Sequence, residues 1–116
     1  MELHNLKLHW VRRHVRVLGA DGTALDLWED DFDRAVQTCA ALVQVARELS
    51  PAPLRGLSLD LRRGVLQVLF EAPGAGNKPV PARLDGAGFD ARVRPVLGAT
   101  VDFGRSALGT PADRVE

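Results

Sequence analysis

The stretch DFDRAVQTCAALVQVARELS, residues 31–50, decides the fold of this 116-residue chain. Its apolar side chains recur at steps of three and four residues, which places them on one stripe of an α-helix and predicts that the stripe faces a core. Asp30 or Asp31 is expected to cap the first turn. Pro51 and Pro53 end the helix, because proline cannot continue it. The stripe consists of Phe32, Ala35, Val36, Cys39, Leu42, Val43, Ala46 and Leu49.

A β-hairpin is predicted on either side of this helix. Residues 11–17 alternate valine with arginine and histidine, residues 20–22 (Ala-Asp-Gly) form a turn, and residues 23–28 resume the alternation. After the helix, residues 54–61 alternate leucine with polar side chains, and residues 65–70 form an apolar run typical of a central strand. This order predicts an α+β fold in which one main amphipathic helix packs on one face of an antiparallel sheet of four to five strands.

The two ends of the chain carry weaker patterns. The first ten residues fit a helical face and a strand face equally well. Residues 73–88 are rich in glycine and proline and are expected to form a loop, and residues 92–103 are expected to form an interrupted edge strand. We therefore predict a single domain over residues 1–103 and a flexible C-terminal tail over residues 104–116.

The charge of the chain is balanced overall but unevenly distributed. Fifteen Lys and Arg match fifteen Asp and Glu, so the footprint of a general nucleic-acid binder is missing and no nucleic-acid partner is expected. Residues 1–19 carry an excess of positive charge, whereas residues 20–33 are strongly acidic. These segments are expected to pair with each other, although they could instead meet a partner.

The expected localisation depends on two signals, a membrane-spanning run and a secretory signal. No uncharged run approaches the roughly 18 residues that span a bilayer, so no membrane association is expected. Residues 1–10 contain charged side chains and no apolar core of a secretory signal. We therefore expect a cytoplasmic protein.

No cluster of residues indicates a catalytic site, and the chain is not expected to be an enzyme or to bind a cofactor or metal. Residues 74–78 lack the spacing and the Ser or Thr of a phosphate loop. His4, His9 and His14 are spaced by five, a spacing that no single helix or strand brings onto one face. The carboxylates of residues 29–33 lack the spacing of a calcium loop.

The order of elements resembles the roadblock (dynein-light-chain type) family. VRVLGADGTALDLW, residues 15–28, is similar to the first hairpin of these domains, and the Ala-rich helix of residues 32–49 resembles the helix that follows it. LRGLSLDLRRGVLQVLF, residues 54–70, is similar to their next hairpin. Family members usually open with a full helix and close with a strand and a helix, which these residues do not predict. The resemblance is therefore that of a divergent, truncated member.

The resemblance implies a non-enzymatic scaffold for protein–protein interaction. Roadblock-type domains form homodimers through the central helix and the edge strand beside it, and bacterial members bind small Ras-like GTPases and take part in their regulation. Carried over to this chain, it implies a homodimer and a small GTPase as partner. The candidate interface residues are Val36, Cys39, Ala40 and Val43 of the helix, and Leu54, Leu57, Leu59 and Leu61 of the strand.

Two alternatives stay open. The apolar stripe of the helix could be buried within one monomer instead of between two. A PAS-like or profilin-like domain that senses a small molecule would share the same order of elements. A pocket under the helix, lined by Trp10, Trp28 and Phe70, would favour this alternative.

Overall fold

The structure, a computed structural model, describes residues 2–72, 74 and 78–113. Within these residues six strands form one antiparallel sheet, in the order β3-β2-β1-β4-β5-β6. The strands are β1 (Leu3–His9), β2 (His14–Gly19), β3 (Ala24–Trp28), β4 (Leu54–Asp60), β5 (Val65–Phe70) and β6 (Val80–Leu84). The helices are α1 (Asp30–Thr38), α2 (Ala40–Arg47), α3 (Gly86–Arg92), the short 3₁₀ helix η1 (Arg94–Val96) and α4 (Gly98–Asp113).

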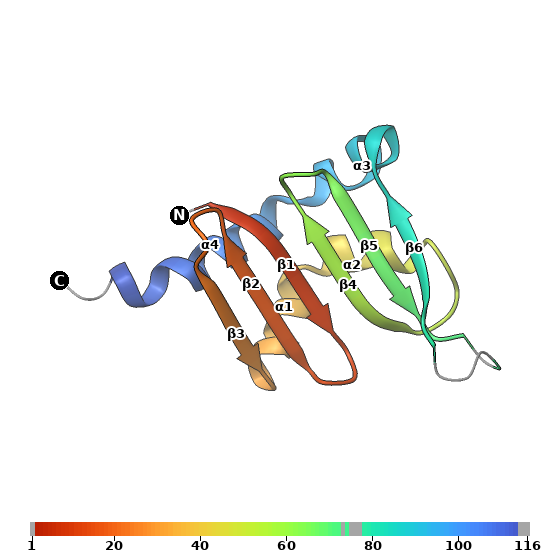
Figure 1. The fold of residues 1–116 in the computed structure, drawn as a ribbon, viewed down its shortest axis with the longest axis horizontal. Coiled ribbons are helices and arrows are strands. Elements are labelled where there is room, and N and C mark those ends of the chain that lie inside the picture. Colours follow the sequence, from red (N-terminus) through yellow and green to blue (C-terminus); the bar gives the residue numbers. More distant parts are fainter. Residues whose placement is uncertain (1, 73, 75–77, 114–116) are drawn as a thin grey trace.

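The helices leave one face of the sheet open. Helices α1, α2 and α4 lie behind the sheet, and α3 lies beyond one end of it, near β5 (Figure 1). Strand residues that point towards the helices are buried, because strand side chains alternate between the two faces. Those of the four inner strands are Leu6, Leu8, Val15, Val17, Leu57, Leu59, Leu66 and Val68.

The α+β class and both predicted hairpins are confirmed. Strands β2 and β3 pair through the turn at Gly22, whose φ is +92°, and β4 pairs with β5. The predicted number of strands and helices was too small. The ambiguous first residues form β1, because β2 and β4 pair with it on either side. Part of the predicted loop forms β6, an edge strand, which is where a strand can accommodate Pro81.

The central helix is shorter and differently capped than predicted. It is divided at Cys39, whose backbone departs from helical geometry, into α1 and α2. The N-cap residue is Glu29, with φ of +53° and no side-chain cap, so the prediction that an aspartate caps the helix was wrong. Asp31 pairs with Arg34 and Asp33 pairs with Arg13 instead. Of the two predicted caps, Asp31 is therefore engaged in an ion pair within the first turn of the helix.

The predicted pairing between the basic and acidic segments is confirmed. Arg13, in the turn between β1 and β2, also lies 3.5 Å from a carboxylate oxygen of Glu29. Arg16 of β2 donates to Asp26 of β3 across the sheet, at 3.2 Å. Lys7 of β1 takes part in no ion pair among the described residues. It is therefore the unpaired cation that the basic segment places on the sheet.

The predictions for the last third of the chain were wrong. Residues 92–103 form no strand, and the expected tail continues helix α4 as far as Asp113. The physical reason is a four-residue spacing of the buried positions Thr100, Gly104 and Leu108 in α4, of which only Leu108 has a large apolar side chain that the sequence pattern reveals. Residues 114–116, and residues 73 and 75–77 of the predicted loop, lie outside the described part of the chain.

Gly104 allows α4 to pack closely on β1. A Cβ atom at this position would lie 2.8 Å from both Cδ atoms of Leu3, which is inside van der Waals contact. Leu3 is itself buried and cannot move away freely. The absent side chain of Gly104 therefore sets how near the helix comes to the sheet.

Substituting Gly104 tests this packing. Gly104→Ala is expected to lower the free energy of unfolding by about 1–3 kcal/mol through overpacking, even though alanine favours a helix over glycine. Gly98→Ala is the matched control, because nothing lies within 4 Å of its Cβ position, and it should be neutral or stabilise by up to about 1 kcal/mol. Denaturant unfolding monitored by circular dichroism measures both. Equal effects of the two variants would show that α4 does not rest on Leu3.

Candidate functional site

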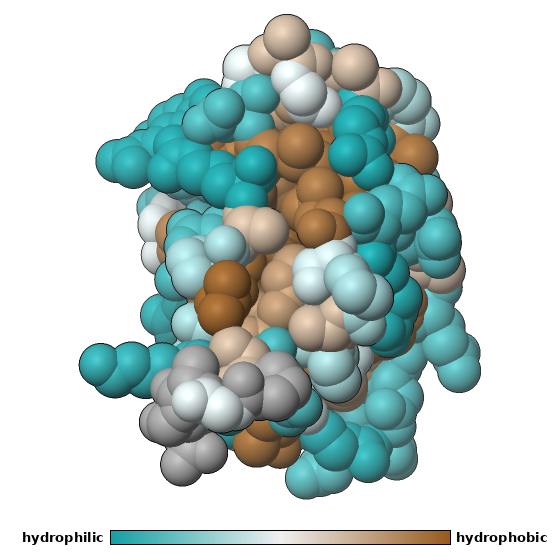
Figure 2. Space-filling view, turned by 90° about the vertical axis from the view of Figure 1, so that its right-hand side faces the viewer, coloured by the Kyte–Doolittle hydropathy of each residue, from teal (hydrophilic) through white to brown (hydrophobic). Residues whose placement is uncertain are grey.

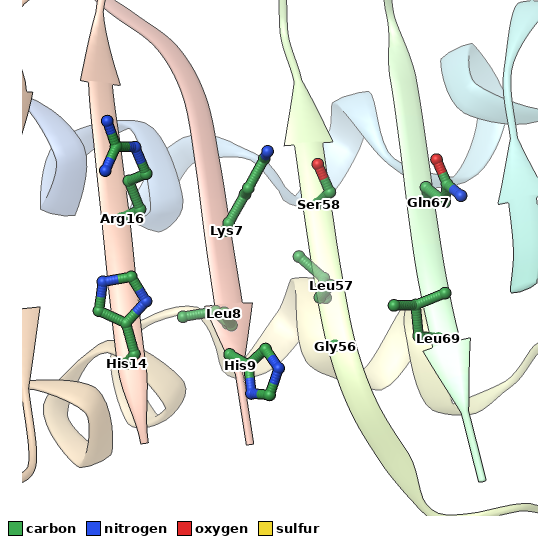
Figure 3. Close-up of a pocket in the computed structure, with 10 residues that line it drawn as sticks. All are labelled: Lys7, Leu8, His9, His14, Arg16, Gly56, Leu57, Ser58, Gln67 and Leu69. Atoms are coloured by element: carbon green, nitrogen blue, oxygen red, sulfur yellow. The ribbon is translucent and has the colours of Figure 1, made fainter. Parts of the chain in front are cut away.

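The uncovered side of the sheet, here called the open face, carries the strand residues that point away from the helices. On the four inner strands the register places them in rows across the sheet. One row runs from His14 through His9 and Gly56 to Leu69, and the next from Arg16 through Lys7 and Ser58 to Gln67. Figure 3 shows the side chains of both rows projecting from β2, β1, β4 and β5.

These two rows surround a shallow pocket of about 330 Å³. Its volume lies at the lower end of the range for small-molecule sites in proteins. Gly56 forms part of the floor, because it places no side chain between His9 and Leu69, its neighbours on the adjacent strands. The lining residues are Lys7, Leu8, His9, His14, Arg16, Gly56, Leu57, Ser58, Gln67 and Leu69.

The lining of the pocket carries cations and imidazoles but no carboxylate. Lys7 and Arg16 supply two positive charges, and of these Arg16 is partly neutralised by Asp26 beside the pocket. A second, smaller depression of about 170 Å³ shares Lys7, Ser58 and Gln67 with the first. It adds two arginines and a single carboxylate, Arg63, Arg83 and Asp60. Both arginines pair with carboxylates, Arg63 with Asp60 at 4.0 Å and Arg83 with Asp85 at 2.9 Å, so Lys7 is the unpaired cation among the described residues of the two depressions.

His9 is held as a neutral hydrogen-bond donor at the edge of the pocket. Its Nδ1 accepts the backbone N–H of Arg12 at 3.3 Å, so in the neutral ring the proton lies on Nε2. Burial lowers the pKa of His9, and the positive charges of Arg12, Arg55 and His14 lower it further. The pocket thus offers an N–H group without a full charge at this point.

His14 and Trp28 form a flat, partly exposed surface beside the pocket. Their ring centroids are 4.2 Å apart, with planes inclined by 35°. His14 Nε2 lies 2.8 Å from Oδ1 of Asp26, and this bond is the largest of the causes that lower the pKa of Asp26. Trp28 remains 48 % exposed, which is unusual for so large an apolar side chain. A planar ligand could continue this stack.

The aromatic pocket expected for a PAS-like or profilin-like sensor is not formed. Trp28 lies on the open face, whereas Phe70 is buried on the face that the helices cover. Trp10 packs edge-on against Phe32 of α1, with centroids 5.6 Å apart. Strand alternation separates these side chains, because Trp28 and Phe70 belong to opposite faces of one sheet.

Most of the interface residues implied by the roadblock resemblance are buried within the single chain. Cys39, between α1 and α2, and Val43 of α2 are buried, and Leu54, Leu57 and Leu59 lie in the core. Strand β4 is hydrogen-bonded to β1 on one side and to β5 on the other, so it offers no free edge to a second copy. Among the remaining candidates, Val36 and Leu61 are half-buried and Ala40 is exposed. Self-association of the chain remains a prediction, and of the candidate residues only Val36, Ala40 and Leu61 are accessible to a second copy.

Other chemistry-bearing residues do not form a second convincing site. The β1–β2 hairpin places His9 opposite His14, although no single strand carries both on one face. Even so, no three metal-binding side chains cluster among the described residues. The thiol of Cys39 is buried, and burial raises its pKa, which makes it a poor nucleophile. None of the described helices is long and apolar enough to cross a bilayer.

A groove of about 560 Å³ lies between β3, α1 and α4, on the helix side of the sheet. Its floor is apolar, with Leu25, Leu27 and Phe103, and its rim holds Arg34 and Asp31, which already pair with each other. It is larger than the pocket on the open face, but apart from the Arg34–Asp31 pair its charged lining is the single carboxylate of Asp102, and the described residues that line it include no unpaired cation. The open face is therefore the stronger candidate.

This site was not predicted from the sequence, because the polar residues of each strand were expected to be ordinary solvated side chains. The available signal was the alternation of Lys7, His9, His14 and Arg16 with apolar residues, which places all four on one face once β1 and β2 pair. The contributions of Ser58, Gln67 and Gly56 depend on the pairing of β1 with β4, which the sequence does not reveal.

The lowered pKa of His9 predicts a pH dependence of stability. Its ordinary pKa is 6.5, so just below pH 6.5 the unfolded chain binds more protons at His9 than the folded chain. The free energy of unfolding contributed by His9 should therefore decrease as the pH falls below about 6.5. His9→Gln should lose less stability than the wild type between pH 7.5 and pH 5, measured by urea unfolding. Parallel pH profiles would contradict a lowered pKa at His9.

The comparisons with known proteins leave the assignment to the geometry of the chain itself. No family model matches the chain, no curated protein matches it, and no solved structure matches it.

Proposed function

We propose that the protein is a non-enzymatic binding module whose open face binds an anionic ligand. The observation that supports this proposal is the composition of the pocket, in which Lys7 and Arg16 meet two imidazoles and no carboxylate. Lys7 has no opposite charge to satisfy it among the described residues, so an incoming anion would not have to displace an internal partner. Charge-assisted hydrogen bonds from lysine and arginine are the usual means by which proteins hold phosphate and carboxylate groups.

The pocket does not favour catalysis. Ser58 is its single hydroxyl, and no hydrogen bond joins it to His9 or His14 among the described residues. An activated nucleophile needs a base within hydrogen-bond reach, and here one histidine is engaged by a backbone N–H and the other by Asp26. Binding without turnover is the function that this arrangement supports.

Lys7→Glu tests the anion site directly. With inorganic pyrophosphate as the probe, the variant is expected to lose at least about tenfold in affinity, measured by isothermal titration calorimetry. The reason is that a carboxylate, which repels the anionic probe, replaces the cation of Lys7. The matched control is Arg47→Glu, which makes the same change of charge on the exposed surface of α2. Equal losses in both variants would mean that pyrophosphate responds only to net charge and that the open face is not a site.

A second candidate function is the homodimeric scaffold for a small GTPase that the roadblock resemblance implies. The observation that favours self-association is on the β6 side of the molecule, where Figure 2 shows hydrophobic surface between hydrophilic residues. Val80 is 48 % exposed there, and Ala82 and Leu84 are only partly buried. Strand β6 also ends the sheet, so its outer backbone edge is available for pairing with a second copy.

Light scattering tests the homodimer. A chain that associates through β6 should have a mass of about twice 12.6 kDa, and Val80→Arg should reduce it to the monomer. Val11→Arg is the control, because Val11 is a comparably exposed valine, 62 % accessible, in the turn after β1. Val43 is unsuitable for this experiment, since a charge at its buried position would unfold the chain. A wild-type monomer at high concentration would exclude the homodimer.

A further inference from the structure

We infer that the ligand of the open face is a nucleotide, held with its ring against Gly56 and its phosphate against Lys7 and Arg16. This inference rests on the proposed anion-binding function and names the ligand class. It follows from the arrangement of the pocket, in which an apolar notch and a cationic row lie side by side (Figure 3).

The notch exists because residue 56 has no side chain. Gly56 lies between His9 of β1 and Leu69 of β5 in the register. A Cβ atom at Gly56 would already contact Leu69, at 3.4 Å from its Cδ1. Neighbouring strands are about 4.8 Å apart, so the backbones of His9 and Leu69 lie roughly 10 Å apart across the glycine, and the side chain of Leu69 leans over it. A flat ring can rest against Gly56 on the side that faces His9, with Leu69 as its wall.

The cationic row lies one step along the same strands. Lys7 precedes His9 by two residues on β1, and Ser58 follows Gly56 by two residues on the antiparallel strand β4, which corresponds to roughly 7 Å. A sugar spans this separation between a ring and its phosphate. Lys7 and Arg16 then meet the phosphate oxygens, and Ser58 and Gln67 offer neutral hydrogen-bonding groups to the sugar hydroxyls or the ring edge.

The neighbouring surfaces match a nucleotide better than a simple anion. A bare phosphate would use Lys7 and Arg16 but would leave the notch at Gly56 and the wall formed by Leu69 empty. The neutral imidazole of His9 can donate its Nε2 proton to an acceptor atom of the ring. The exposed ring of Trp28, stacked on His14, lies next to the pocket and could hold a second base.

The nucleotide can come from two sources, and the chemistry of a single unit is the same in both. A free nucleotide would occupy only the pocket. A single-stranded nucleic acid would place one unit in the pocket and a further base on Trp28, with its phosphates along Arg63 and Arg83 of the adjoining depression.

Calorimetric titrations of the full chain with adenosine and uridine 5′-monophosphates, ribose 5-phosphate and pyrophosphate test the inference. At least one nucleotide should bind at least about tenfold tighter than ribose 5-phosphate, because ribose 5-phosphate lacks the ring. Gly56→Val fills the notch and should abolish this difference. Gly56→Ala adds one methyl group and should reduce the difference by a smaller factor, which keeps the test available if the valine variant does not fold.

A ten-residue single-stranded DNA distinguishes the sources. Binding no tighter than that of the mononucleotide supports the free nucleotide. Tighter binding that Trp28→Ala removes supports the single strand. Equal affinity for ribose 5-phosphate and both nucleotides, with no effect of Gly56→Val, would overturn the nucleotide and leave the anion site intact. If no phosphate compound binds, the inference and the proposed function both fail.

Discussion

The pairing of β1 with β4 is the constraint on which the rest of the structure depends. Every other strand pair in the described sheet joins strands that are adjacent along the chain, whereas this one joins segments about fifty residues apart. It brings Leu6 against Leu59 and Leu8 against Leu57, and all four are almost completely buried. Two three-stranded halves thereby become one sheet with a single core. The entropy of closing the long intervening loop has to be offset by this apolar contact.

The same pairing creates the candidate site on the other side of the sheet. Strand alternation means that the register which joins leucines towards the helices also joins Lys7 to Ser58 and His9 to Gly56 on the open face. Half of the pocket therefore comes from each half of the fold. The core and the binding surface therefore both depend on the register of the β1–β4 pairing. A shift of this register by one residue would destroy both.

How much of the structure the sequence predicts depends on how far apart the interacting residues are along the chain. The hairpins of β2 with β3 and of β4 with β5 could be predicted, because alternation and a glycine turn are local signals. Helix α4 could not, since its buried positions include Thr100 and Gly104, which carry no large apolar side chain, and packing on β1 supplies the missing stability. The open-face site shows the same division. Lys7, His9, His14 and Arg16 could be placed on one hairpin face, but Gly56 and Gln67 join them only through long-range pairing.

The sequence by itself determined the α+β class, the two hairpins and the ion pairing between the basic and acidic segments, because each of these depends on patterns within a few tens of residues. Only the tertiary structure decided that β4 lies at the centre of the sheet, that helices α1, α2 and α4 share one face (Figure 1), and that the other face stays open with a pocket at Gly56. The physical reason is that burial and strand order are properties of the whole chain. In the sequence, Leu57 is one leucine of an alternating pattern. Its pairing with Leu8 and Val68 makes it part of the core and leaves the next residue, Ser58, on the open face.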